Sequence, residues 1–274
     1  MLRGSNFRQL AAGALSRYGV FGLFRWSEMS SSSTIEWTDA TWNPVTGCTK
    51  ISRGCDFCYA EAFAERFRGV KDHHFGEGFD LTLRPERLQQ PLAWKTSKVI
   101  FVNSMSDLFH KDIPRSFVDK VFDVMEQCNW HIFQVLTKRS TNLKRYINMR
   151  YAGAPCPQHI WLGVSVEDAQ ARSRIRHLQE SAATTRFLSV EPLLDDLGEL
   201  DLTGVHWVIV GGESGSRARP MQPDWARNVR DQCTAQAVPF FFKQWGKYGP
   251  DGVGRHKKKN GRLLDGVEYN EMPR

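Results

Sequence analysis

Short runs of consecutive apolar residues recur along the chain, and this recurrence constrains the fold more than any other feature. Six runs lie between residues 99 and 243, and their first residues are 33, 28, 26, 21 and 32 residues apart. A run that is apolar at every position is typical of a strand buried on both faces, as in a parallel sheet. The six predicted strands are Val99–Asn103, Ile132–Leu136, Ile160–Val164, Arg186–Val190, Trp207–Val210 and Pro239–Lys243.

The spacing between these runs leaves room for one crossover helix each time, as parallel strands require. Two earlier strands are predicted near Ala40–Val45 and Phe79–Leu83. We therefore predict an α/β fold, a (βα) barrel that is either partial with six units or complete with eight. The predicted helices are Arg115–Gln127, Ser140–Arg150, Asp168–Glu180 and Pro223–Ala237.

Polar residues follow the predicted strands at or near the point where each strand ends. In a parallel barrel these residues surround one end, which we call the mouth, and such folds place their active sites there. Solvent exposure of the loops explains polar residues after one or two of the strands. Polar residues after all six strands, with Lys, Arg and Glu among them, favour a functional site at this end of the sheet. The residues singled out are Asp107, Lys138, Arg139, Glu191, Gly211, Gly212, Glu213, Ser214 and Lys243.

The charged residues among these suggest separate roles. Asp107, Glu191 and Lys243 are the catalytic candidates, because carboxylates and amines transfer protons and bind specific polar groups. Lys138 and Arg139, with Arg217 and Arg219, could bind an anion, since cationic side chains pair with carboxylate and phosphate groups. Solvated loop charges are the alternative for some of these four. The sequence contains no P-loop and no Ser/His/Asp order typical of a hydrolase.

The formal net charge of +7 on 274 residues is concentrated at the two ends of the chain. Residues 1–27 contain four Arg and no acidic residue, and residues 240–274 contain eight Lys or Arg against four acidic residues. Residues 28–239 hold the remaining 25 basic and 26 acidic residues. This distribution excludes a uniformly basic DNA-binding domain. No apolar run reaches the roughly 18 residues of a membrane span, so no membrane partner is expected.

The chain divides into three predicted segments. Residues 1–33 form a disordered leader, which has the composition of a transit peptide but is also explained by a start-site artefact, because Met29 precedes the patterned region. A short surface helix is a third interpretation. Residues 34–248 form the barrel, and residues 249–274 form a basic C-terminal extension. Without a clear secretory signal, we expect a cytoplasmic protein.

Three cysteines form the pattern Cys48-x6-Cys55-x2-Cys58 within eleven residues. A disulfide is disfavoured by the odd number of cysteines and the missing secretory signal, so the pattern indicates a metal site. Structural zinc needs four ligands, which His73 or His74 could complete. A [4Fe–4S] cluster held by three cysteines would keep one iron open for an exogenous ligand. The other cysteines are expected to be buried: Cys128, Cys156 and Cys233.

The order Cys55-Asp56-Phe57-Cys58, followed by Tyr59, resembles the cluster loop of the radical S-adenosylmethionine superfamily, although six residues stand in a first gap that usually has three. A closer resemblance, over residues 34–274, is to a phage- and prophage-associated protein family of unknown function. Its matching segments are IEWTDATWNPVTGC, CYAE, NSMSDLFH, LTKR, LGVSVE, SVEPLL, GGESG, FKQWG and GRLLDG…NEMP.

The superfamily resemblance implies a radical enzyme with a [4Fe–4S] cluster on Cys48, Cys55 and Cys58. It also implies S-adenosylmethionine as a small-molecule cofactor and a reducing electron donor as a partner. The turn Gly211–Ser214 is similar to the superfamily's glycine-rich methionine-binding strand, and an ordinary glycine-rich turn is the alternative.

The substrate class follows from the phage resemblance and from the basic run Lys257–Lys259. We expect a nucleobase or nucleic acid that is modified or repaired after hydrogen abstraction. Spore photoproduct lyases, which act on DNA, are the superfamily precedent. The alternative function is a zinc- or cluster-stabilised nucleic-acid-binding protein without catalysis.

Overall fold

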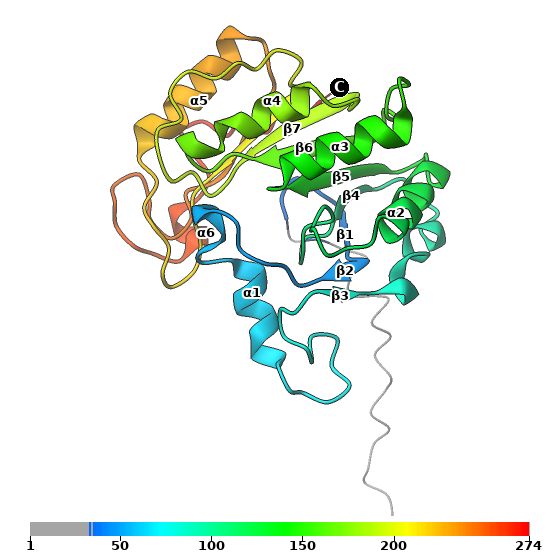
Figure 1. Ribbon diagram of the computed structural model, residues 1–274. Helices are drawn as coiled ribbons and strands as arrows, with labels where there is room; N and C mark the ends of the chain where they lie inside the picture. The colour runs from blue at the N-terminus through cyan, green and yellow to red at the C-terminus, as the bar shows by residue number, and fades with distance from the viewer. Residues whose placement is uncertain (1–32, 34, 274) are drawn as a thin grey trace, which may run out of the picture.

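Seven parallel strands form one curved sheet in the computed structural model, which describes residues 33 and 35–273 (Figure 1). Neighbouring strands pair in the order β1-β4-β5-β6-β7-β8-β9. Within the described residues the outer strands β1 and β9 do not pair with each other, so the sheet is an open, partial barrel. The strands are β1 (Ala40–Trp42), β4 (Val99–Val102), β5 (Ile132–Thr137), β6 (Ile160–Ser165), β7 (Thr185–Val190), β8 (Trp207–Gly211) and β9 (Phe240–Gln244).

All six predicted strands in the second part of the chain are confirmed, with ends that differ by one residue. The predicted partial barrel is also confirmed, but its count of six or eight units was wrong, because the sheet has seven strands. The region near Ala40–Val45 supplies β1 and then β2 (Val45–Thr46). The region near Phe79–Leu83 supplies only β3 (Thr82–Leu83), which pairs antiparallel with β2 outside the main sheet.

Four helices cover the outer face of the sheet (Figure 1). Their apolar side chains recur three or four residues apart, as in α2, where Phe117, Val121 and Met125 are buried. The predicted helix over 168–180 begins as a 3₁₀ turn, and the crossover from β7 to β8 contains no helix in the structure. The helices are α2 (Arg115–Gln127), α3 (Ser140–Tyr151), α4 (Ser173–Gln179) and α5 (Pro223–Ala235).

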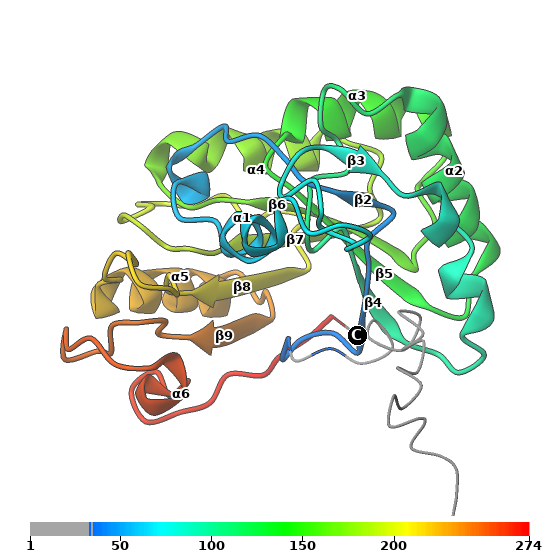
Figure 2. The same ribbon diagram turned by 90° about the horizontal axis from the view of Figure 1, so that it is seen from below.

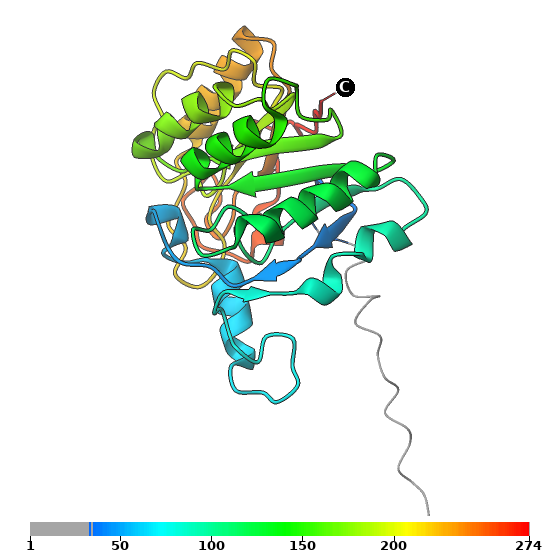
Figure 3. The same ribbon diagram turned by 45° about the vertical axis from the view of Figure 1, so that its right-hand side comes forward.

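The remaining helical elements are short, and apart from η5, the 3₁₀ turn at the start of the predicted helix over 168–180, they were not predicted. None of the helices in the described part of the chain is long and apolar enough to cross a membrane. Helix α1 and the β2–β3 pair lie together, away from α3, α4 and α5 (Figure 3). The short elements are η1 (Arg53–Cys55), α1 (Tyr59–Ala64), η2 (Glu65–Phe67), η3 (Pro85–Arg87), η4 (Gln90–Ala93), η5 (Ala169–Arg172) and α6 (Lys257–Asn260).

The inner face of the sheet carries its own apolar cluster, separate from the core beneath the helices. We call it the inner aromatic cluster. Trp207 of β8 lies at its centre, fully buried, with four other aromatic rings at centroid distances of 5.9 to 6.1 Å. The cluster consists of Trp37, Phe101, Trp161, Phe187, Trp207, Ile209 and Phe241.

The end of the chain packs back onto this inner face. Residue Asn270 forms an antiparallel bridge with Phe241 of β9. The carbonyl oxygen of Glu271 accepts a hydrogen bond from the Trp207 indole at 2.7 Å, and Met272 packs against the cluster. Part of the predicted C-terminal extension therefore covers the edge of the sheet. The predicted leader lies outside the described residues apart from Ser33.

Candidate functional site

The carboxyl ends of the seven parallel strands lie at the same end of the sheet and form the predicted mouth (Figure 2). Side chains on the inner face become smaller along the strands before the charged residues begin. A Cβ atom on Gly163 of β6 would collide with the ring of Phe187, and one on Gly211 of β8 would lie 3.2 Å from the Glu191 carboxyl group. Small residues therefore separate the inner aromatic cluster from the charged mouth.

The three predicted ligand cysteines lie on one loop between β2 and α1, which we call the cysteine loop (residues 47–58). Gly47 begins the loop with a φ of 81°, and its N–H group donates to the carbonyl of Met105 at 3.0 Å. Cys48, Cys55 and Cys58 are half-buried and free. Burial raises the pKa of the Cys48 and Cys58 thiols, and among the smaller causes Cys55 raises the pKa of both.

The donor set fits an iron–sulfur cluster, because three free thiols are the soft ligands that such clusters use. In the part of the chain that the structure describes, no three His, Cys, Asp or Glu side chains converge closely enough to hold a metal ion. The histidines that could complete a zinc site lie among aromatic rings. His73 stacks on Phe67 at 3.9 Å between ring centroids, and His74 packs edge-on against Phe75 at 4.6 Å.

An arginine from the end of β5 holds the first cysteine. Arg139 Nη1 donates to the Sγ of Cys48 at 3.4 Å and to Oδ2 of Asp107 at 2.9 Å. Its Nη2 donates to the carbonyl of Thr49 at 2.8 Å. The predicted residues Asp107 and Arg139 are thus brought together with Cys48 in one hydrogen-bonded group.

A buried glutamate after β6 holds the middle of the cysteine loop. The fully buried Glu167 accepts hydrogen bonds from Ser52 Oγ and from Arg174 Nη1, the latter at 2.7 Å, and the predicted residue Lys138 lies 3.9 Å away. Burial alone would raise the pKa of Glu167, but Lys138, Arg174 and the hydrogen bonds hold that pKa below its ordinary value. A Cβ atom on Gly54 would lie 2.9 Å from this side chain, so the loop packs directly on it.

An arginine held by Glu213 reaches the other side of the loop. Glu213, one of the predicted residues after β8, accepts hydrogen bonds from the Nε and Nη2 atoms of Arg219 at 2.9 and 2.7 Å. The same guanidinium donates to Asp56 Oδ2 at 3.1 Å and to the Arg53 carbonyl at 2.9 Å. It also lies over the ring of Phe57 at 4.9 Å.

Two further predicted residues form an ion pair at the mouth. Lys243 Nζ lies 2.9 Å from both carboxylate oxygens of Glu191, which joins the ends of β9 and β7. The two side chains are 16% and 20% exposed, so solvent or a ligand can reach them.

The remaining predicted residues are placed by the glycine-rich turn. Ser214 Oγ accepts a hydrogen bond from Gln244 Nε2 at 3.0 Å. A Cβ atom on Gly212 would collide with the carbonyl of Trp245, so the close approach of these two segments requires glycine at this position. Gly211 and Gly212 thus shape the backbone between β8 and β9.

Two contacts of this site come from residues that were not predicted. Ser52 and Arg174 contact Glu167 from the cysteine loop and from α4, and their long separations along the chain give no local signal. Arg219 was expected to bind an anion, and in the structure its guanidinium group pairs with Glu213 and Asp56. The sequence does contain a signal for Glu167, because this residue comes two positions after the end of β6, just as the predicted residues Asp107 and Lys138 come soon after their strands. Asn103 ends a predicted strand, and both atoms of its buried carboxamide lack a hydrogen-bond partner in the described structure.

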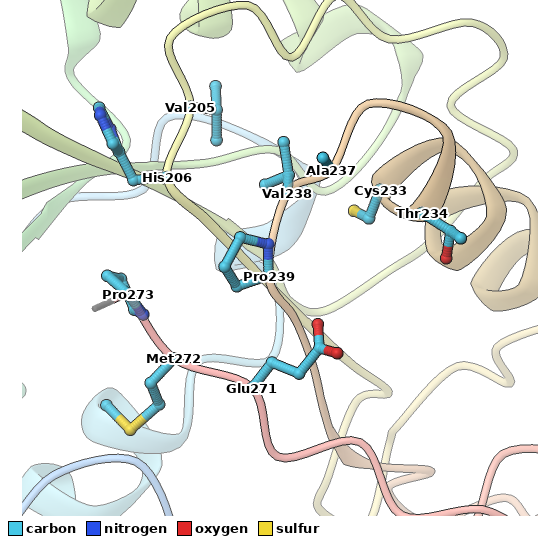
Figure 4. A pocket seen from close by; sticks show the side chains of 10 residues that line it. All are labelled: Val205, His206, Cys233, Thr234, Ala237, Val238, Pro239, Glu271, Met272 and Pro273. Atoms are coloured by element: carbon cyan, nitrogen blue, oxygen red, sulfur yellow. The ribbon is translucent and has the colours of Figure 1, made fainter.

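A hollow of about 810 Å³ lies at the opposite end of the strands (Figure 4). It is built from residues that precede β8 and β9 and from the last residues of the chain. None of the predicted site residues lines it, and we place the candidate site at the mouth because the sulfur and charged groups are there. Its lining residues are Val205, His206, Cys233, Thr234, Ala237, Val238, Pro239, Glu271, Met272 and Pro273.

The comparisons with known proteins give a family and one solved structure. The structure of "Spore photoproduct lyase complexed with dinucleoside spore photoproduct" is similar to this chain with a TM-score of 0.46 and 10% sequence identity. The similarity covers 76% of this chain and 64% of that one, so the chain spans less than two thirds of that protein. No curated protein sequence matches the chain. The family model described as "Protein of unknown function (DUF5131)" matches residues 32–273, and the chain therefore belongs to this family.

Proposed function

We propose that the protein is a radical S-adenosylmethionine-type enzyme whose [4Fe–4S] cluster binds to Cys48, Cys55 and Cys58. One observation carries the proposal: three free thiols share a loop that side chains following three different strands hold over the mouth of a partial (βα) barrel. A structural metal site closes all its coordination positions. Three cysteines leave one iron open, which is what binding of a cofactor requires.

When bound, the cluster supplies one electron from an external low-potential donor to S-adenosylmethionine, which splits into methionine and a 5′-deoxyadenosyl radical that takes a hydrogen atom from the substrate. The chain's own residues position the reactants. Arg139, Glu167 and Arg219 fix the cysteine loop. The Lys243 ammonium group at the mouth can bind a carboxylate or phosphate, and Glu191 can accept a hydrogen bond from an amine or a base.

Asp107 takes a positioning role in this proposal. Its carboxylate accepts hydrogen bonds from Thr137 Oγ1 at 2.7 Å, from the Lys138 N–H group at 3.1 Å and from the Phe109 N–H group at 3.0 Å, besides the one from Arg139. All these contacts are within the protein. These contacts favour a role for Asp107 in aligning the ends of β4 and β5 and not in transferring a proton.

Metal content tests the cluster. Protein purified and reconstituted under anaerobic conditions is expected to contain about four iron atoms per chain and to cleave S-adenosylmethionine to 5′-deoxyadenosine when reduced. Cys55→Ser should lose most of the iron and all of the cleavage. Cys128→Ser is the matched control, because Cys128 is buried in the core at the C-terminal end of α2 and should leave the iron content unchanged.

Two outcomes would contradict the proposal. One is an intact cluster that does not cleave S-adenosylmethionine under strong reduction. The other is a single tightly bound zinc ion that Cys55→Ser removes, which would favour the non-catalytic binding protein instead. The phage association and the cytoplasmic location stay predictions from the sequence.

For the substrate, we propose a nucleic acid strand. The exposed side chains of Lys257, Lys258 and Lys259 have no acidic partner among the described residues. The segment that carries them is joined to the mouth, because the Lys247 N–H group donates to the Glu213 carbonyl at 2.9 Å and the Arg255 N–H group to the Lys247 carbonyl at 2.8 Å. Unpaired ammonium groups at this end of the sheet fit a phosphate backbone.

Salt-dependent binding of a single-stranded oligonucleotide tests this substrate class. Replacing Lys257, Lys258 and Lys259 with Gln should weaken binding and reduce the slope of log K against log salt by about 2, since each phosphate contact contributes about 0.7. The control replaces the exposed residues Lys71, Lys111 and Lys120 with Gln. Equal losses in the two triple variants would mean non-specific attraction and would refute a phosphate site at the lysine run.

A further inference from the structure

The contact between Arg139 and Cys48 distinguishes this cysteine from the other two. The Arg139 side chain is 8% exposed, and its Nη1 atom lies 3.4 Å from the Sγ of Cys48. Among the described residues, no other arginine or lysine donates to a cysteine sulfur of the loop. The sulfur of Cys55 lies 3.9 Å from the neutral hydroxyl of Ser52.

The guanidinium group is fixed in this position. Its Nη1 atom also donates to Asp107 at 2.9 Å, and its Nη2 atom donates to both oxygens of Thr49, at 2.8 Å to the carbonyl and 3.1 Å to the hydroxyl. The Asp107 carboxylate is itself held by three hydrogen bonds from the ends of β4 and β5. The cation therefore cannot move away from the sulfur without breaking the three other hydrogen bonds of its guanidinium group.

A hydrogen bond from a cation to a ligand sulfur has a known physical effect. It withdraws electron density from the thiolate and stabilises the more negative, reduced state of an attached metal centre. Burial strengthens the effect, because water screens the charge less. A carboxylate next to the cation acts in the opposite direction.

We propose that Arg139 is a positioning residue that raises the reduction potential of the cluster through Cys48, and that Asp107 limits this increase. The proposal rests on the proposed function, because it requires a cluster on the cysteine loop. It adds a role that the three ligands alone do not have: the protein sets how readily the cluster accepts its electron. Arg139 would also make the three ligand cysteines electronically unequal.

The test is a redox titration of the reconstituted holoprotein, followed by electron paramagnetic resonance and by absorbance. Arg139→Gln removes the cation and is expected to shift the midpoint potential to more negative values, with iron content unchanged. Asp107→Asn removes the opposing carboxylate with little change in shape and is expected to shift the potential to more positive values. Arg219→Gln is the control, since this arginine holds the loop without touching a sulfur atom.

The opposite signs separate the electrostatic role from a structural one. If Arg139→Gln does not fold, a positive shift of the midpoint potential in Asp107→Asn is enough to support the electrostatic role. A potential equal to that of the wild type in both variants, or shifts of the same sign, would overturn the proposal while leaving the enzyme function intact. A wild-type protein that binds no iron would instead refute the proposed function.

Discussion

Asn103 has a backbone conformation and a buried side chain that both lower the stability of the fold. It follows β4 with a φ of 58°, a left-handed conformation that costs non-glycine residues free energy. Its side chain is 2% exposed, and neither carboxamide atom has a partner among the described residues. Buried polar groups without partners are rare, and strained residues of this kind gather at functional sites.

Two substitutions of Asn103 measure these costs. Asn103→Gly should raise the free energy of unfolding by about 1 kcal/mol, because removing an unpaired amide gains about 1–3 kcal/mol and glycine's entropy offsets part of that. Asn103→Ala should be less stable than Asn103→Gly by about 1–2 kcal/mol, since alanine is strained at this φ. Urea unfolding measures both. A glycine variant less stable than the wild type would show that the carboxamide has a partner in solution.

The cysteine loop is the element on which the candidate site depends. Its own secondary structure is one 3₁₀ turn, η1, without a side-chain cap. Its position comes from Arg139, Glu167 and Arg219, which reach it from the ends of β5, β6 and β8. A loop held at three places limits how far its three cysteines can move relative to the mouth, which favours the proposed cluster site.

Glu167 is expected to be the most sensitive of these contacts. Glu167→Gln leaves Arg174 and Lys138, which are 12% and 18% exposed, without their counter-charge, and should lower the free energy of unfolding by about 3 kcal/mol at pH 7. Urea unfolding checks this value. Glu61→Gln, at an ion pair that is half exposed, is the control and should cost about 1 kcal/mol or less.

The effect of Glu167→Gln on the free energy of unfolding should depend on pH in a defined direction. The folded-state pKa of Glu167 lies below its ordinary value of 4.5, so its charge stabilises the fold above pH 4.5. That stabilisation is lost as the pH falls through the lower, folded-state pKa. The difference in the free energy of unfolding between wild type and Glu167→Gln should therefore become smaller below pH 4.5. A difference that is constant from pH 7 to pH 3 would contradict the charge argument.

At the scale of the whole molecule, the two faces of the sheet are covered in different ways. Helices α2 to α5 cover the outer face, whereas Ile35 and Met272, near the two ends of the described chain, pack against the inner aromatic cluster. The backbone of Tyr269 accepts a hydrogen bond from the Phe242 N–H group at 3.1 Å, so the C-terminal segment also pairs with the edge of β9. In a complete barrel the edge of β9 would be paired with another strand. In this open sheet the C-terminal segment covers that edge instead.

Deleting residues 268–274 should expose this edge. The indole of Trp207 loses its acceptor on Glu271 and part of the cluster meets water, so the free energy of unfolding should fall by about 2–3 kcal/mol, the value of one large apolar side chain. Thermal unfolding measures the loss, and tryptophan emission should move to longer wavelength. Val267→Ser, at a half-exposed residue before the deletion, is the control. Unchanged emission would mean that the segment does not cover Trp207.

Local patterns account for what could be predicted. The continuous apolar runs located six strands, and the apolar spacing with Pro114 before it located α2 from Arg115 to Gln127. The pairing of β3 with β2 could not be predicted, because a two-residue strand has no period to detect. The helix over 168–180 was predicted too long, since Asp168 caps a 3₁₀ turn through its side chain and the α-helix starts five residues later.

The sequence by itself determined the parallel sheet, the polar ends of its strands and the three cysteines, because each of these is written in neighbouring residues. Only the tertiary structure decided that the barrel stays open at seven strands and that Arg139, Glu167 and Arg219 hold the cysteine loop. Arg139 contacts a cysteine 91 residues away, and Arg219 contacts an aspartate 163 residues away. Such pairs depend on how the whole chain packs, and no local pattern encodes them.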